Sequence, residues 1–263
     1  NRINKYMNLG GISMILLLSG EGVTDLGGCD LSLPQCSNDL SGYFIYGVLT
    51  YIIDSIFNSK MGYSLQDMPD SIYYIDKSLL ITNSKASSFG RNLNNMRGFK
   101  KAPETGYYSS NAKTLGLMAL ELQKQKECPV VAILFRDSDG TRSAANNDWQ
   151  VKYDSMVQGF HSAHCETGVP MLAKPKSEAW LLAACKDNPY QHCHLLEEES
   201  GNDDSVNSLK DQLAAKIGGT HSSQTLVNWI QSIDYNYVTI AEQMPSFNAF
   251  YQRFIEVLHN CRN

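Results

Sequence analysis

Four acidic side chains follow two apolar segments of the chain. Glu21 and Asp25 stand in GEGVTD, directly after ISMILLLS, and Asp137 and Asp139 stand in RDSDGT, directly after VVAILF. Alternate residues of an extended segment point to the same side, so Asp137 and Asp139 face a common point. Carboxylates of this kind bind hard divalent cations such as Mg²⁺ or Mn²⁺. Because four carboxylates brought together repel one another unless a cation neutralises them, the pattern predicts a metal site.

Two of the acids also have structural interpretations. Asp25 is a plausible cap of the turn or helix that follows it, which is a common place for aspartate. Glu178, in the run AKPKSEAWLLAA, stands where an acid compensates the dipole of a helix N-terminus. Glu21, Asp137 and Asp139 have few structural explanations at strand ends, so we predict that these three are catalytic and that they bind the metal together with Asp25.

A basic segment is the candidate contact for a polyanion. Residues 84–104 combine cationic side chains with phenylalanine, glycine and asparagine, as in flexible loops that follow a phosphate backbone and stack on bases. A solvated linker is the alternative. Lys174 and Lys176, beside Glu178, are further candidates for balancing a bound phosphate. The cationic residues of the basic segment are Lys85, Arg91, Arg97, Lys100 and Lys101.

The elements that must position these residues alternate between strands and helices. Short apolar runs predict strands, and apolar residues at helical spacing predict helices. This alternation predicts an α/β fold with a mostly parallel sheet flanked by helices, whose ligands gather at the carboxyl ends of the strands. The expected strands are 13–19, 72–82, 130–135 and 169–173, and the expected helices are 40–57, 111–126, 147–162, 177–186, 205–217, 223–233 and 246–260.

The same pattern suggests a domain organisation. Residues 12–187 are expected to form the catalytic domain, with an insertion around 58–110 that separates the two acidic motifs. Residues 188–263 are expected to form a helical C-terminal cap or subdomain. Residues 1–11 read as a disordered lead-in or a tag remnant.

Composition limits the classes of function. The chain has 263 residues, 43% of them hydrophobic, and a formal net charge of −5, so it can bury a sizeable core but has no overall field that attracts polyanions. Any nucleic-acid contact must therefore be local. No apolar run approaches the roughly 18 residues that cross a bilayer, and we expect a soluble, cytoplasmic protein without membrane contact.

The cysteines and histidines suggest no defined site. The seven cysteines are an odd number without a C-x-x-C pair, which favours free thiols in a reducing compartment. HSAHC at 161–165 and HCH at 192–194 contain possible zinc ligands, but their spacing favours packed or surface side chains. Trp180 and Trp229 stand among apolar residues and are expected in the core.

The acidic motifs resemble those of the Toprim domain, the Rossmann-like catalytic module of topoisomerases, primases and nucleases of the overcoming-lysogenization-defect class. The E-G-x-x-D pattern from Glu21 to Asp25 and the D-x-D of Asp137 and Asp139 match that family. The run P-x-x-E-A-W-L-L around Glu178 resembles small defence-associated Toprim proteins, which implies that Glu178 is an additional acid at the metal. The resemblance implies an Mg²⁺- or Mn²⁺-dependent nuclease acting on DNA or RNA. By analogy, a partner ATPase, an anti-phage setting and possible homo-oligomerisation are expected.

Two other interpretations stay open. DSDGT also resembles the signature of haloacid dehalogenase-like phosphatases, in which Asp137 would be the nucleophile, Asp139 the general acid and Thr141 a phosphate ligand. In that family the signature normally lies on the first strand, whereas more than 120 residues precede it here, and Arg136 is unusual in such a strand. The third interpretation is a catalytically inactive binding or assembly subunit.

Overall fold

The computed structural model describes residues 14–39, 41, 43–88, 103–138, 149–219 and 222–262. It is an α/β fold, as predicted, with a central sheet in the order β3-β5-β1-β6-β7. Strands β1, β5, β6 and β7 are parallel, and β3 pairs antiparallel at one edge. The strands are β1 (Ile15–Ser19), β2 (Gly27–Cys29), β3 (Gln35–Ser37), β4 (Phe44–Tyr46), β5 (Ile72–Ile75), β6 (Val130–Asp137) and β7 (Gly168–Ala173).

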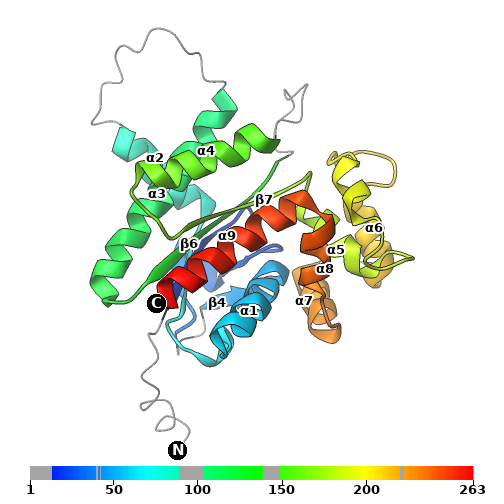
Figure 1. Cartoon of the computed structure of the whole chain (residues 1–263), viewed down its shortest axis with the longest axis horizontal. Coiled ribbons are helices and arrows are strands. Elements are labelled where there is room, and N and C mark those ends of the chain that lie inside the picture. Colours follow the sequence, from blue (N-terminus) through cyan, green and yellow to red (C-terminus); the bar gives the residue numbers. More distant parts are fainter. Residues whose placement is uncertain are drawn as a thin grey trace, which may run out of the picture.

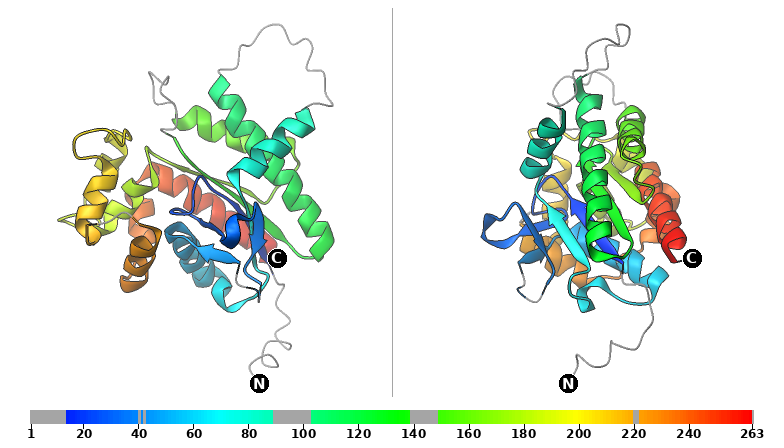
Figure 2. Two further views of the ribbon diagram at one scale, coloured as in Figure 1. Left: turned by 180° about the vertical axis from the view of Figure 1, so that it is seen from behind. Right: turned by 90° about the vertical axis from the view of Figure 1, so that its left-hand side faces the viewer.

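Helices cover both faces of this sheet. On one face, α1 and α9 pack on β1, β6 and β7, and on the other face α3 and α4 do so. Seen from behind, α2 and α3 lie in front of the sheet and α9 lies behind it (Figures 1 and 2). The helices are α1 (Val48–Met61), α2 (Lys77–Ser88), α3 (Pro103–Lys126), α4 (Trp149–Ser162), α5 (Ser177–Cys185), α6 (Leu209–Ile217), α7 (Ser223–Ser232), α8 (Tyr237–Gln243) and α9 (Pro245–Arg262).

The strands are apolar because both faces are covered. Along β6, Val131, Ile133 and Phe135 pack against the α1 and α9 side. The alternate residues Ala132 and Leu134 pack against α3 and α4. A strand buried on both faces has no polar side for water, which explains the continuous run VVAILF.

The helix expected over 40–57 begins later than predicted. Residues 44–46 form strand β4, which pairs with β2 in a separate two-stranded sheet, and α1 starts at Val48. Gly47 ends the strand where two backbones touch, because a Cβ there would lie 2.2 Å from the carbonyl oxygen of Asp25. This close approach, which only glycine permits, separates the strand from the helix.

The strand expected over 72–82 is also shorter than predicted. It ends at Ile75, and the Asp76 side chain accepts a hydrogen bond of 2.7 Å from the backbone N–H of Ser78. Such a bond satisfies a free N–H at a helix start, so α2 begins at Lys77. Since β5 lies between β1 and β3 in the sheet, the segment 58–110 contributes to the core and is not only an insertion.

The C-terminal region joins the sheet through α9 and a buried polar network. Trp180, fully buried as predicted, donates its indole N–H to Ser246 at 2.8 Å, and Ser246 donates its hydroxyl to the buried Glu197 at 2.6 Å. Trp229 lies partly buried at the edge of the same core. The network ties α5 and α9 to the 3-10 helix Cys193–Glu198.

The prediction of seven free thiols is wrong for two of them. Cys29 and Cys36 form a disulfide with Cα atoms 5.6 Å apart. The chain turns between β2 and β3, which brings the two sulfurs together although the sequence shows no recognised pairing pattern. The other five, Cys128, Cys165, Cys185, Cys193 and Cys261, form no disulfide.

Candidate active site

Glu21 and Asp137 lie at the topological switch point of the sheet, where the crossover connections change side. Strand β1 pairs with β5 on one side and with β6 on the other, so the crossovers from this point go to opposite sides. The carboxyl ends of β1 and β6 therefore border the crevice in which open α/β sheets bind ligands. Glu21 follows β1 and Asp137 ends β6, so the topology brings the two motifs together.

Asp25 and Asp137 are held by the same serine. The Ser177 hydroxyl donates to the Oδ1 atom of Asp25 at 2.7 Å, and the Ser177 backbone N–H donates to the Oδ1 atom of Asp137 at 3.0 Å. Ser177 is the first residue of α5, where backbone N–H groups are free to bind anions. Asp25 thus contacts a residue 152 positions away, which a local capping role does not explain.

Asp137 is the electrostatic centre of the acidic cluster, which consists of Glu21, Asp25, Asp137 and Glu178. Burial raises the pKa of Asp137 well above its usual range, and the negative charges of Asp25, then Glu178, then Glu21 raise it further. The hydrogen bond from the Ser177 backbone N–H lowers this pKa, but by less. Glu178 is 8% exposed in the first turn of α5. Its position compensates the helix dipole and also places its charge beside Asp137.

Glu21 lies on the other side of the cluster, among cations. The Lys77 ammonium is 3.2 Å from its Oε1 atom, and the Nε atom of Arg136 is 3.8 Å from the same oxygen. Arg136 is fully buried, and the ring of Tyr107 lies 5.8 Å from its guanidinium carbon. The Glu21 side chain is 26% exposed, so a ligand can reach its carboxylate from the solvent.

The first turn of α1 fixes the loop that carries Glu21 and Asp25. The backbone N–H of Leu49 donates to the carbonyl of Asp25 at 2.9 Å, and the Thr50 hydroxyl donates to the carbonyl of Leu26 at 2.5 Å. Thr50 and Leu26 are both fully buried. The acids therefore stand on a loop anchored to the core.

The end of β6 is fixed from the α3 and α4 side. Tyr108 donates its hydroxyl to the carbonyl of Asp137 at 3.0 Å, and the buried Lys152 ammonium donates to the carbonyl of Ser138. Burial, then the charge of Glu21, raises the pKa of Tyr108, so its hydroxyl stays a donor at neutral pH. These bonds hold Asp137 against the other acids.

The acidic cluster offers carboxylate oxygens, the kind of ligand that hard divalent cations bind. Three neighbouring carboxylates and burial oppose ionisation of Asp137, and a cation relieves this repulsion. Asp25 and Asp137 offer oxygen ligands around one serine, and Mg²⁺ needs only one or two carboxylates beside waters and phosphate oxygens. Within the described ranges no three Asp, Glu, His or Cys side chains form a metal site by themselves. The predicted ligand Asp139 lies outside those ranges.

The predicted basic contacts lie in different parts of the molecule. Lys176 lies beside the cluster but forms an ion pair of 2.7 Å with Asp203. Lys174 is partly buried near Glu197, whose pKa burial raises and the charge of Lys174 only partly lowers again. Lys85 is exposed in the last turn of α2, while Arg91, Arg97, Lys100 and Lys101 lie outside the described residues.

Sequence reasoning missed three residues that shape the cluster, namely Lys77, Arg136 and Ser177. Only Arg136 carried a signal, because a charged residue inside a strand buried on both faces requires a partner. Lys77 fell within an expected strand, and Ser177 follows a proline-containing segment whose path the sequence does not specify.

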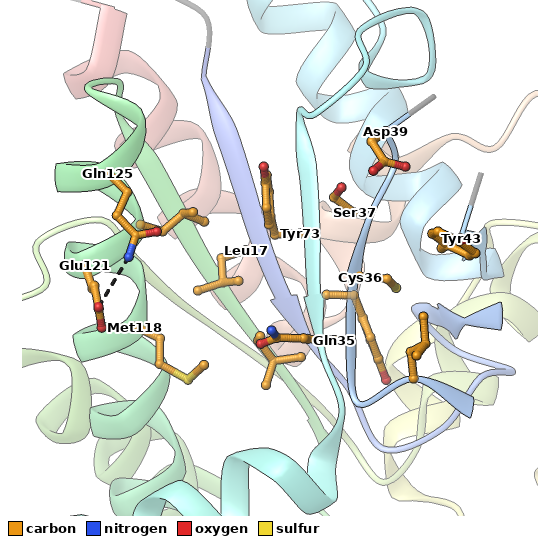
Figure 3. Close-up of a pocket in the computed structure, with 14 residues that line it drawn as sticks. Leu17, Gln35, Cys36, Ser37, Asp39, Tyr43, Tyr73, Met118, Glu121 and Gln125 are labelled. Atoms are coloured by element: carbon orange, nitrogen blue, oxygen red, sulfur yellow. Dashed lines mark hydrogen bonds between the residues drawn. The ribbon is translucent and has the colours of Figure 1, made fainter. Parts of the chain in front are cut away.

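A separate cavity of about 470 Å³ opens near the edge of the sheet. It lies between α3 and the strands β3 and β5, with Tyr73 and Gln35 on one side and Met118 and Gln125 on the other (Figure 3). None of the four carboxylates of the acidic cluster lines it. The cavity is therefore distinct from the site at the strand ends.

Comparison of the chain with protein-family models, curated protein sequences and solved structures found no match. The helices within the described ranges are all too short or too polar to cross a bilayer.

Proposed function

We propose that this chain is a divalent-metal-dependent nuclease whose active site is the acidic cluster at the carboxyl ends of β1 and β6. The observation that carries the proposal is the convergence of four carboxylates at the topological switch point of the sheet. Ser177 hydrogen-bonds to two of them, Asp25 and Asp137, and the other two are Glu21 and Glu178. Structural ion pairs normally balance opposite charges, whereas this cluster gathers like charges that oppose the ionisation of Asp137. Such an excess of like charge, with a strongly shifted pKa, is typical of catalytic and ligand-binding sites.

The residues would share the work between the two sides of the cluster. Asp25 and Asp137 would hold Mg²⁺ or Mn²⁺ with the charge of Glu178 close by, and the Toprim resemblance implies Asp139 as a further ligand. When bound, the metal would polarise the phosphodiester and lower the pKa of an attacking water. Glu21 is partly exposed and oriented by Lys77, so it is our candidate for accepting the proton of that water.

Cleavage assays test this proposal directly. Supercoiled plasmid, single-stranded DNA and RNA are incubated with the protein and Mg²⁺, Mn²⁺ or EDTA. We expect metal-dependent cleavage of at least one substrate, and a loss of about 10²-fold or more in Glu21→Gln and Asp137→Asn, since positioned acid–base and charged groups contribute that much.

The control is Asp204→Asn, because Asp204 is exposed on a turn of the C-terminal region. It undergoes the same chemical change as Asp137→Asn and should cleave like the wild type. Wild-type protein that cleaves none of the substrates, or full activity in both cluster variants, would refute the nuclease.

The phosphatase and the binding-subunit interpretations predict different results. Turnover of p-nitrophenyl phosphate without nucleic-acid cleavage, with loss in Thr141→Ala, would favour the phosphatase. Inactivity towards all these substrates, with a stable complex recovered from cells, would favour a binding subunit. Three expectations stay predictions by analogy: a partner ATPase, an anti-phage setting and homo-oligomerisation. ATP-dependent stimulation of cleavage by a co-purifying protein would support the partner ATPase.

A further inference from the structure

Several buried polar atoms on β1, β6 and α3 have no hydrogen-bond partner in the described structure. They are the Ser19 hydroxyl, the Tyr107 hydroxyl, the Asn111 Nδ2 atom, and the Nε and Nη2 atoms of Arg136. Buried polar groups are nearly always hydrogen-bonded, so each exception requires an explanation such as a bound water or ion. Only one other side-chain atom among the described residues shares this condition, the Tyr63 hydroxyl.

These atoms belong to facing surfaces of β1, β6 and α3. Leu17 of β1 and Leu134 of β6 face α3, so Ser19 and Arg136, each two residues further along, face it as well. Tyr107 and Asn111 lie one turn apart on α3 and share a helix face. Since the Tyr107 ring is 5.8 Å from the Arg136 guanidinium, the two sets meet.

All of the unpaired groups can donate a hydrogen bond. Arg136 and Lys77 carry two positive charges on this side of the cluster, whereas Glu21 is the acid that pairs with both. The net charge of these three groups is therefore positive, although the carboxylates of Asp25, Asp137 and Glu178 lie in the same cluster. A set of free donors with surplus positive charge suits an oxyanion.

We propose that Ser19, Tyr107, Asn111 and Arg136 form an anion subsite that receives the non-bridging oxygens of the substrate's phosphate group. The assignment to a phosphodiester rests on the proposed nuclease function, while the anion subsite itself rests on the unpaired donors. Arg136 contributes a planar fork whose Nε and Nη2 atoms have no hydrogen-bond partner, and such a fork matches phosphate geometry better than an ammonium does. Glu21, whose side chain is 26% exposed, lies 3.8 Å from the Nε atom of Arg136 at the edge of this subsite.

Thermal unfolding of the metal-free protein in EDTA tests the subsite without any activity assay. Inorganic phosphate is titrated against sodium chloride at matched ionic strength. A ligand that binds the folded state raises Tm in a saturable way. Asn111→Leu removes the Nδ2 donor and keeps a side chain of similar size, so it should fold. It should weaken phosphate binding by roughly tenfold, as expected for one hydrogen bond to a charged group.

Tyr63→Phe is the matched control. It removes the remaining unpaired hydroxyl, which borders a cavity with Met14 and Ile15 at the opposite ends of the strands. It should respond to phosphate like the wild type, which also corrects for the general stabilisation by phosphate salts. Arg136→Lys should bind phosphate more weakly because the fork is lost.

The outcomes separate the subsite from the proposed function. No rise in wild-type Tm beyond the chloride control, or equal rises in Asn111→Leu and Tyr63→Phe, would overturn the subsite even if the protein cleaves nucleic acid. A phosphate-dependent rise that Asn111→Leu weakens would support it even if cleavage is absent. A dinucleoside monophosphate should stabilise the wild type as well, and stabilisation by inorganic phosphate alone would overturn the assignment to a diester.

Discussion

Replacement of Asp137 by asparagine gives the most direct test of the metal site. Asp25 and Asp137 are the two carboxylates that Ser177 fixes, so Asp137→Asn removes one of two positioned charges without changing the side-chain size. We expect Mn²⁺ to stabilise the wild type and to stabilise the variant far less. Differential scanning fluorimetry with increasing Mn²⁺ measures both.

The expected magnitude follows from linkage. Mn²⁺ at about 100 times its Kd stabilises the folded state by about 2.7 kcal/mol, which corresponds to a Tm increase of about 5–11 °C for a chain of this size. If the variant binds about a hundredfold more weakly, the same concentration gives about 0.4 kcal/mol and a shift of about 1–2 °C.

The pH dependence without metal has a defined sign. Burial and the neighbouring acids raise the pKa of Asp137, so the folded state holds that proton more tightly than the unfolded state. Wild-type stability is therefore lost as pH rises from the ordinary carboxyl range through the raised pKa. Asparagine does not ionise, so in EDTA Asp137→Asn should be more stable than the wild type at neutral pH, and the difference should vanish at acidic pH.

Two results would refute this reasoning. Equal Mn²⁺ shifts in the wild type and Asp137→Asn would show that Asp137 does not hold the metal. A variant that is less stable than the wild type at neutral pH in EDTA would show that the acidic cluster is not strained by like charges. The control Asp204→Asn should match the wild type in both measurements.

Further predictions concern the packing that supports the site. Ser246→Ala should lower the free energy of unfolding by about 2–4 kcal/mol in urea titrations, because it leaves the buried Trp180 N–H without its acceptor and Glu197 without one donor. Gly159→Ala should lower it by about 1–3 kcal/mol, because the new Cβ would lie 2.3 Å from a backbone oxygen of α3. Lys176→Met should change it by less than about 1 kcal/mol, since its ion-pair partner is exposed.

Local patterns in the sequence were sufficient for the parallel strands and for most of the helices, but they missed β2, β3, β4, α2 and α8. Continuous apolar runs marked β1, β6 and β7, and helical spacing marked the end of α3, because both patterns report which faces of an element are buried. They failed at the boundaries of β4 and β5. There a tight backbone contact at Gly47 and a side-chain cap at Asp76 decide where one element ends and the next begins.

The sequence by itself determined that acids follow β1 and β6, and thus that two carboxylate motifs stand at strand ends. Only the tertiary structure decided which side chains surround them. Ser177 and Lys77 are far from both motifs in sequence, and the pairing of Cys29 with Cys36 depends on the turn between β2 and β3. Periodicity reports burial along one element, whereas the surroundings of a charge depend on contacts between elements, which sequence spacing does not contain.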